Sequence, residues 1–214
     1  MTIVREGYPF IGACFLLTLL FGFGVHPYAA IVPFVVMLYF CYFFRNPHRT
    51  IVLDASAILS PADGTVQEIV DFERDPDEFV PGACKKVIIF MSVFDVHVNR
   101  SPMDGEIKLQ KYFCGRFRPA YKDEVGFVNE HHLIGLENER LRITVKQIAG
   151  ILARRIVSWV TMDDVLKQGE LYGMIRFGSC LEVVMPAADV DVLVQPGEKV
   201  TGGKTILGRI KENA

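Results

Sequence analysis

Two apolar runs without a charged side chain dominate the N-terminal part of the chain. The first extends from Pro9 to Val25 and the second from Tyr28 to Phe44. Each is about 17 residues long, the lower end of what a helix needs to span a bilayer. His26 and Pro27 favour a tight turn between them. Because so few positions could face water, residues 1–48 are predicted to form a helical hairpin in a membrane and not a buried pair of core helices.

The flanks of the hairpin predict its orientation. Arg5 precedes the first run, Arg45 and Arg49 follow the second, and the turn between the runs has no Lys or Arg. Positive residues favour the cytoplasmic side, so both ends are expected there. A cleaved signal peptide fits poorly, since the apolar region is doubled and no Ala-x-Ala site follows it. The predicted location is the cell membrane, with residues 49–214 on the cytoplasmic face; spanning and shallow insertion both stay open.

From Ile51 onward the periodicity changes from helical to strand-like. Short segments rich in Val and Ile alternate with Gly, Pro and Asp turns, which predicts a compact antiparallel β domain over residues 49–214. One run, Gly150–Val160, reads as helical. The run Pro196–Gly208 predicts a hammerhead-like hairpin, and the acidic run Asp71–Asp77 a solvated loop. The expected fold class is mainly β (α+β), with the N-terminal helical hairpin added. The expected strands are Thr65–Val70, Lys86–Phe90, Glu106–Phe113, Glu130–Leu136, Arg140–Ile148, Glu182–Met185, Asp191–Val194 and Thr205–Ile210.

Composition narrows the classes of function. The net charge of -2 leaves no basic footprint for nucleic acid. The five cysteines are odd in number and form no CxxC pair, which argues against a disulfide framework and against a structural metal. The run Gly202–Thr205 lacks the spacing of a phosphate-binding loop and indicates a turn.

Three separated stretches hold the candidate chemistry. Ser60–Gly64 reads Ser-Pro-Ala-Asp-Gly, Phe94–Arg100 reads Phe-Asp-Val-His-Val-Asn-Arg, and Phe177–Ser179 reads Phe-Gly-Ser. A bare Gly-Ser step usually marks a bend, and Pro-x-Asp-Gly is ordinary turn chemistry. However, a hydroxyl, an imidazole and a carboxylate are also the parts of an activated nucleophile.

Together the three stretches resemble the short form of the phosphatidylserine decarboxylases. The resemblance implies a zymogen that cleaves its own chain between Gly178 and Ser179 and converts Ser179 into a covalent pyruvoyl group. It further implies that this group forms a Schiff base with phosphatidylserine, and that phosphatidylethanolamine and carbon dioxide are released. In the family Asp63 would support self-cleavage, and His97 would handle protons during decarboxylation. The implied partners are phosphatidylserine, the membrane, and the large and small chains of one precursor; a homo-oligomer stays open.

The sequence departs from the family at Arg100, where longer relatives carry a second histidine credited with activating the serine. Arginine stays protonated and is no ordinary base. Three alternatives remain: His97 serves both steps, His131 or His132 contributes, or strain and oxyanion donors suffice. We favour His97 for both steps. Cys180 is a second departure, and we interpret it as a small packing residue.

Arg154 and Arg155 resemble a run found throughout the short family. Paired arginines suit a phosphate or carboxylate through bidentate hydrogen bonds, so both are candidate substrate contacts. The alternative is a solvated helix face.

Two other functions compete with this interpretation. Pro61–Val66 and Pro196–Ile206 also resemble lipoyl or biotinyl hammerheads, which would suit a membrane-anchored adaptor without enzymatic activity. That alternative lacks the Met-Lys carrier dipeptide and coiled-coil heptads, and it leaves Phe-Gly-Ser unexplained. The second is the same chemistry on an archaeal-type serine phospholipid.

Overall fold

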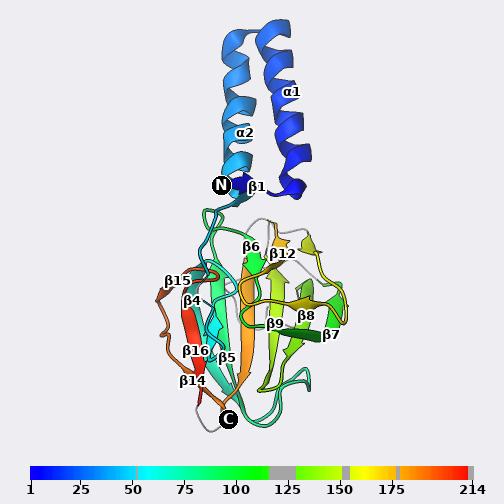
Figure 1. The fold of residues 1–214 in the computed structure, drawn as a ribbon. Helices are drawn as coiled ribbons and strands as arrows, with labels where there is room; N and C mark the ends of the chain where they lie inside the picture. Colours follow the sequence, from blue (N-terminus) through cyan, green and yellow to red (C-terminus); the bar gives the residue numbers. More distant parts are fainter. Residues whose placement is uncertain (52, 116–128, 151–154, 177–178, 212–214) are drawn as a thin grey trace. The chain divides into compact units, whose positions relative to one another are not determined.

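The computed structural model describes residues 1–214 apart from 52, 116–128, 151–154, 177–178 and 212–214. The chain divides into two compact units, Met1–His48 and Arg49–Ala214 (Figure 1). The predicted fold class is confirmed: the second unit is built from antiparallel strands, and the first is a helix pair.

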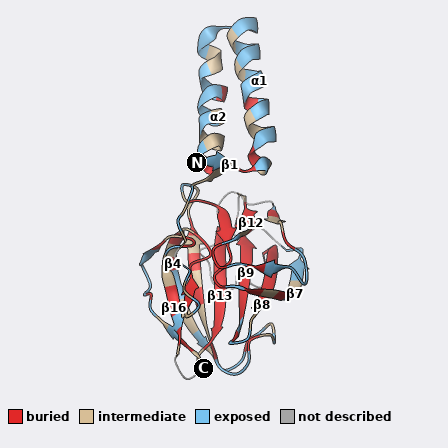
Figure 2. Ribbon diagram, viewed as in Figure 1, coloured by how far each residue is buried: buried red, intermediate tan, exposed pale blue. Residues whose placement is uncertain are grey.

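The first unit consists of two apolar helices joined by a short turn. Helix α1 covers Tyr8–Gly24 and helix α2 covers Ile31–Phe43. The turns η1 (Arg5–Gly7) and η2 (Pro27–Ala30) precede them, and the short strands β1 (Thr2–Ile3) and β2 (Arg45–Asn46) pair at the base. The continuous helical stretch Arg5–Gly24 has a mean hydropathy of 1.7 and is long and apolar enough to cross a membrane. Most of its side chains are exposed (Figure 2).

The second unit is organised around one eight-stranded antiparallel sheet. Its central strands are β9, β13 and β5, and each bonds to its neighbours along most of its length. In spatial order the strands are β11 Val165–Leu166, β7 Gly105–Phe113, β8 His131–Glu137, β9 Arg142–Ala149, β13 Ser179–Pro186, β5 Cys84–Met91, β4 Gly64–Phe72 and β15 Lys199–Val200.

Two three-stranded sheets complete this unit. One has the order β10 (Ile156–Ser158), β12 (Leu171–Ile175) and β6 (Val98–Arg100). The other has the order β14 (Val190–Val192), β16 (Ile206–Ile210) and β3 (Ala57–Leu59). The first of these sheets brings β6, far upstream in the sequence, beside the strand that leads into Ser179.

Strand alternation explains where the core lies. Successive side chains of a strand point to opposite faces, so every second residue of β5, β9 and β13 faces the same side. On that side Ile89, Val145 and Val183 are fully buried in one large apolar cluster. Every residue of β13 is buried, which Figure 2 shows as a red strand in the middle of the sheet.

The other face of the sheet is buried at its central strand β13, and the acidic run contacts this face. Asp75 is buried and accepts hydrogen bonds from the amides of Phe79 and Val80. Asp77 pairs with Lys146 of β9 at 2.9 Å, with both side chains largely buried. The prediction of a solvated loop was therefore wrong for this part of the run, because these carboxylates satisfy backbone and lysine donors of the domain.

Two local predictions were also wrong. Of the segment expected to be helical, Gly150–Val160, residues 151–154 lie outside the described residues, whereas Ile156–Ser158 form strand β10 paired with β12. The run Pro196–Gly208 does contain a turn and two strands. However, β15 pairs with β4 in the large sheet while β16 pairs with β14 and β3, so the two strands form no hairpin together.

Candidate active site

Ser179 is the first residue of β13 and lies between two neighbouring strands. Its register partners are Met91 of β5 and Ala149 of β9. The residue is fully buried, and its Oγ donates a hydrogen bond to Met91 Sδ at 3.4 Å. The predicted cleavage partner, Gly178, lies outside the described residues. The hydroxyl is thus held at a fixed position at the end of the central strand.

His97 is fully buried immediately before strand β6. Its Nδ1 lies 2.9 Å from the Asp95 carbonyl oxygen. Because a carbonyl oxygen only accepts, Nδ1 bears the proton and Nε2 is the basic nitrogen. The His97 carbonyl accepts a hydrogen bond from the Ile175 amide, at the end of the strand leading to Ser179. The fold therefore brings the predicted imidazole and the predicted nucleophile to the same region.

Asn99 is a polar residue of this region that the sequence did not single out. It is fully buried in β6, and its Nδ2 lies 4.0 Å from the same Met91 Sδ that accepts from Ser179. Asn99 lies two positions after His97, in the strand that His97 precedes. That spacing, in the motif Phe94–Arg100, is the signal that could have identified it.

Asp63 is held by a different set of groups. Arg49 grips its carboxylate through both guanidinium nitrogens, at 2.6 and 2.7 Å, and the Gly202 amide donates to Oδ1 at 2.8 Å. The side chains of Arg49 and Asp63 are only 7% and 17% exposed. Next to the aspartate, a Cβ on Gly64 would collide with the Phe90 carbonyl, so the strand β4 can begin there only with glycine.

Arg100 belongs to the Asp63 side of the site. It alternates with Asn99 along β6, so the two side chains leave opposite faces of the strand. Its Nη1 donates to the Gly169 carbonyl at 2.9 Å. Burial, and next the positive charge of Arg49, lower the pKa of Arg100. Gly203 has a φ of +73°, and a Cβ at this position would lie only 2.9 Å from Arg100 Cδ, so the position favours glycine. This arginine therefore ties β6 to the loop at Gly169 and packs closely against Gly203.

The three predicted groups are consequently not joined in one hydrogen-bonded triad among the described residues. Ser179 and Asn99 both contact Met91, His97 contacts the Asp95 carbonyl, and Asp63 is engaged by Arg49. The described contacts give the carboxylate a role in holding the loops of Arg49 and Gly202, while the site around Ser179 contains Asn99 in its place.

Cys180 lies on the opposite face of β13 from Ser179. It packs with Ile148, Ile88 and Phe90 in a small apolar cluster. Burial raises the pKa of its thiol, so the reactive thiolate is disfavoured. This is the packing position expected from the sequence.

The two alternative histidines are engaged elsewhere. The Nδ1 of His131 donates to the Asn129 carbonyl at 2.8 Å, and its ring stacks on Phe113. The Nδ1 of His132 lies 3.0 Å from Gln147 Oε1, and its Nε2 lies 3.1 Å from Gln110 Nε2. Burial lowers the pKa of both histidines, which favours their neutral forms. Both ring nitrogens of His132 are thus occupied by amide groups.

Of the two candidate arginines, the structure describes Arg155. Arg154 is outside the described residues. Arg155 is exposed, and its carbonyl accepts a hydrogen bond from the Arg176 amide at 3.2 Å. Arg155 therefore stands at the surface beside the segment that leads to the nucleophile.

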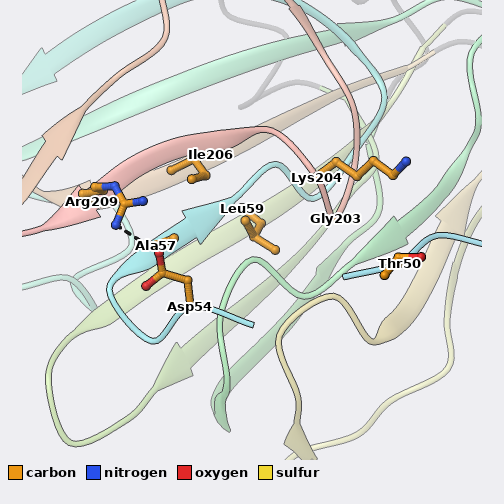
Figure 3. A pocket seen from close by; sticks show the side chains of 8 residues that line it. All are labelled: Thr50, Asp54, Ala57, Leu59, Gly203, Lys204, Ile206 and Arg209. Carbon is orange, nitrogen blue, oxygen red and sulfur yellow. Dashed lines mark hydrogen bonds and ion pairs between the residues drawn. The ribbon is translucent and has the colours of Figure 1, made fainter. Parts of the chain in front are cut away.

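A cavity of about 420 Å³ lies at a separate place, beside strands β3 and β16. Figure 3 shows Arg209 and Asp54 joined by an ion pair along its wall, with Lys204 extending away from them. None of the predicted site residues lines it. No cluster of three or more His, Cys, Asp or Glu side chains suited to a metal occurs in the part of the chain that the structure describes.

Comparison with known proteins gives the family. The sequence profile of the phosphatidylserine decarboxylases matches residues 36–208, which is most of the chain. The chain belongs to the phosphatidylserine decarboxylase family. Proteins named phosphatidylserine decarboxylase proenzyme are similar to it over nearly their full lengths. That of Carboxydothermus hydrogenoformans is 44% identical, covering 99% of this chain and 98% of its own. Those of Symbiobacterium thermophilum (44% identical, 98% and 96%) and Syntrophus aciditrophicus (46%, 96% and 96%) match equally broadly.

Membership confirms the predicted family and enzyme class, a lyase that removes carbon dioxide. The relatives are named proenzymes, which agrees with a precursor that is processed. The match includes all three stretches that suggested the family, since residues 36–208 contain Asp63, His97 and Ser179.

The pair Arg49–Asp63 leads to a stability prediction. Arg49→Ala or Asp63→Ala leaves the partner's charge largely buried without its counter-ion, and we expect the free energy of unfolding to fall by about 3 kcal/mol in either variant. The free energy of unfolding of the double variant should fall no further than that of the worse single variant, because neither buried charge is then left without its counter-ion. Denaturant unfolding of the detergent-solubilised chain measures this. Arg209→Ala, which breaks a more exposed arginine–aspartate pair, is the control with a much smaller expected effect. Additive losses in the double variant would contradict the coupling.

Proposed function

We propose that this chain is the precursor of a pyruvoyl-dependent decarboxylase of phosphatidylserine, which yields phosphatidylethanolamine and carbon dioxide. The observation that most supports this is the position of Ser179: a buried hydroxyl at the first residue of a central strand, in the region of a buried histidine. Family membership and the names of the similar proteins support the same substrate.

Self-cleavage begins with attack of Ser179 Oγ on the preceding carbonyl carbon, which moves the acyl group from nitrogen to oxygen and gives an ester. A base removes the Cα proton of Ser179, and the carboxylate of Gly178 leaves with the electron pair of the C–O bond. The dehydroalanine left at position 179 takes up water and releases ammonia, giving the pyruvoyl group. His97 Nε2 is our candidate base, because Nδ1 is committed to Asp95. The products are chains of 178 and 36 residues.

The strand pairing fits a pyruvoyl group at position 179. After cleavage β13 keeps its partners on both sides from its first residue, so the new end of the small chain stays between β5 and β9. The complete burial of Ser179 excludes bulk water from that position. When present, the pyruvoyl carbonyl supplies an electron sink for the loss of carbon dioxide.

Around this group the chain's own residues bind and protonate. His97 is the proposed general acid that returns a proton to the substrate carbon. Arg154 and Arg155 are the proposed contacts for the phosphate or carboxylate of the headgroup; the surface position of Arg155 beside Arg176 supports this. Asp63 is proposed to support self-cleavage indirectly, through the loops that it ties to Arg49 and Gly202.

The test of this function uses the full-length protein in phospholipid vesicles. Intact-mass measurement should find two chains, with the small chain blocked at the residue that replaces Ser179. Phosphatidylserine labelled at its carboxyl carbon should release labelled carbon dioxide with equal formation of phosphatidylethanolamine. A single uncut chain in an active preparation would reject the mechanism. A single inactive chain would favour the adaptor alternative. Release only from an archaeal-type lipid would favour the second alternative.

We also propose that residues 1–48 anchor the enzyme in the cell membrane with residues 49–214 on the cytoplasmic face. The apolar stretch Arg5–Gly24, the shorter apolar helix Pro27–Phe43 and the basic flanks support this. Such an anchor would hold the enzyme where its lipid substrate is confined.

The topology gives a separate prediction. Protease added to the outer face of sealed cells or spheroplasts should spare the β domain, and protease added after permeabilisation should digest it. Replacing Leu17 of α1 with Asp places a charge in mid-helix, which costs about 2.5–3.5 kcal/mol of insertion free energy and should shift the protein towards the soluble fraction. Digestion from outside would show the opposite orientation.

A further inference from the structure

A chain of four side-chain contacts leads from the half-buried Gln110 of β7 to the neighbourhood of Ser179. Gln110 Nε2 lies 3.1 Å from His132 Nε2, and His132 Nδ1 lies 3.0 Å from Gln147 Oε1. Gln147 Nε2 donates to Asn99 Oδ1 at 2.8 Å, and Asn99 Nδ2 faces Met91 Sδ. Asn99, Gln147 and His132 are almost fully buried. We call these four residues, Gln110, His132, Gln147 and Asn99, the amide relay.

The chemistry of the amide groups fixes the direction of every bond in the relay. An amide nitrogen only donates and an amide oxygen only accepts. Gln110 therefore donates to His132 Nε2, and His132 donates from Nδ1 to Gln147 Oε1. If His132 were protonated, its Nε2–H would face the N–H of Gln110, and two donors would be in contact without an acceptor. The relay thus holds His132 as the neutral Nδ1–H tautomer, in agreement with the lowering of its pKa by burial.

The contacts of Asn99, the last residue of the amide relay, fix the orientation of its side-chain amide. Gln147 occupies the oxygen of the Asn99 amide, so the NH₂ group must point the other way, towards Met91. The same sulfur accepts the hydrogen bond of Ser179 Oγ. A thioether is a weak acceptor, so the Asn99 N–H loses only a weak hydrogen bond when it turns to a stronger acceptor nearby. A rotation of the amide would place its oxygen at the site and would set two donors, Gln147 and Asn99, against each other.

We infer that Asn99 is the oriented hydrogen-bond donor of the self-cleavage centre, and that Gln147 and His132 are positioning residues that hold its amide. This rests on the proposed function, because it concerns the step in which Ser179 attacks. That attack turns a carbonyl oxygen into an oxyanion, and a preorganised N–H donor next to it lowers the barrier. An oxyanion donor at Asn99 would act together with His97 as the base, in a chain where Arg100 stands in the place of the second histidine of longer relatives. It also assigns His132 a positioning role in place of the base considered from the sequence.

The decisive variant is Asn99→Asp. The aspartate keeps the shape of the side chain and an oxygen that accepts from Gln147, but when ionised it offers no donor to the site. Loss of one oxyanion donor typically lowers a rate by about 10²- to 10³-fold, and we expect Asn99→Ala and Asn99→Asp at pH 8 to slow self-cleavage to that extent. A protonated carboxyl has an O–H donor. The ratio of the Asn99→Asp rate to the wild-type rate should therefore rise as the pH is lowered, while the ratio for Asn99→Ala stays flat.

The rates are measured on freshly translated full-length precursor in detergent, sampled over time on denaturing gels at pH 5.5 to 8. Taking ratios to wild type removes the pH dependence that all the precursors share, and the flat ratio expected for Asn99→Ala is the reference for the rise expected for Asn99→Asp. Asn138→Asp, the same substitution on a surface loop, is the matched control and should cut at the wild-type rate. Unfolding midpoints of the variants check that each has folded.

Gln147→Glu tests the relay without changing Asn99. An ionised glutamate can only accept, so the Asn99 amide should turn its NH₂ group towards residue 147 and away from Ser179. Cleavage should again be slow at pH 8 and recover on acidification. Normal cutting by Asn99→Ala and Asn99→Asp, or slow cutting by Asn99→Asp without acid recovery, would overturn the inference while leaving the proposed function intact. Failure of the wild-type precursor to cut would overturn the proposed function itself.

Discussion

Ser179→Ala is expected to leave a single, uncut and inactive chain of 214 residues. Without Oγ no ester forms at position 179, and without the ester there is no leaving carboxylate and no pyruvoyl group. The substitution removes one oxygen atom from a buried site where, among the described residues, the hydroxyl donates to a thioether, so folding should change little. Denaturing gels and intact mass measure the cutting, and labelled carbon dioxide release measures the activity.

Cys180→Ala is the matched control for this variant. Cys180 is the next residue of the same buried strand, but its side chain packs on the opposite face, with Ile148, Ile88 and Phe90. It should cut and decarboxylate as the wild type does, apart from a modest loss of stability. Cleavage of the Ser179→Ala chain at the same peptide bond would show that another group is the nucleophile. Loss of cutting in Cys180→Ala at unchanged stability would point to the thiol.

The pattern of the chain predicted its elements better than their pairing. Uncharged runs and Val-rich alternating segments identify helices and strands because these depend on local burial. Pro196–Gly208 was misjudged because the turn is local whereas the choice of partner is not: β15 and β16 reach two different sheets. Ile156–Ser158 are a strand because β12 offers an edge there, a tertiary contact that propensity does not include.

The candidate site divides in the same way. Ser179, His97 and Asp63 were identified from short motifs, since each motif has recognisable neighbours in the sequence. The long-range contacts of the site were not predicted. Asn99 bonds to Gln147, 48 residues away, and Asp63 bonds to Gly202, 139 residues away. No spacing rule connects such positions. The polar type of Asn99, two places after His97, was the one local clue.

Arg100 explains why the family's expected triad takes a different form here. A histidine at this position would face the Asp63 side of β6, where a carboxylate could hold its ring. The arginine donates to the Gly169 carbonyl instead, and Asp63 is gripped by Arg49, which directly follows the helical unit in sequence. Both arginines thereby tie loops of the β domain together, and under the proposed function the acid–base work at Ser179 is left to other groups. His97 is the titratable group among these.

His97→Ala separates the two reactions that this histidine is proposed to serve. General acid–base assistance is typically worth about 10² to 10⁴ in rate, so each step that uses His97 should slow by that factor. If His97 serves both, as we favour, the variant stays uncut and releases no carbon dioxide. If it serves only the lipid reaction, the chain cuts normally but releases no carbon dioxide.

Both rates are followed in one preparation, with fragment formation and labelled carbon dioxide release sampled together. His97→Gln keeps most of the side-chain volume and an N–H that can donate to the Asp95 carbonyl, but it has no basic nitrogen, so it should behave like His97→Ala if chemistry and not packing is lost. His131→Gln is the control, because that ring stacks on Phe113 and donates to the Asn129 carbonyl, with no contact to Ser179 among the described residues. Normal cutting and normal decarboxylation in both His97 variants would remove this residue from the mechanism. Cleavage would then have to draw its base from solvent or from a group beside Ser179 that the three motifs do not contain.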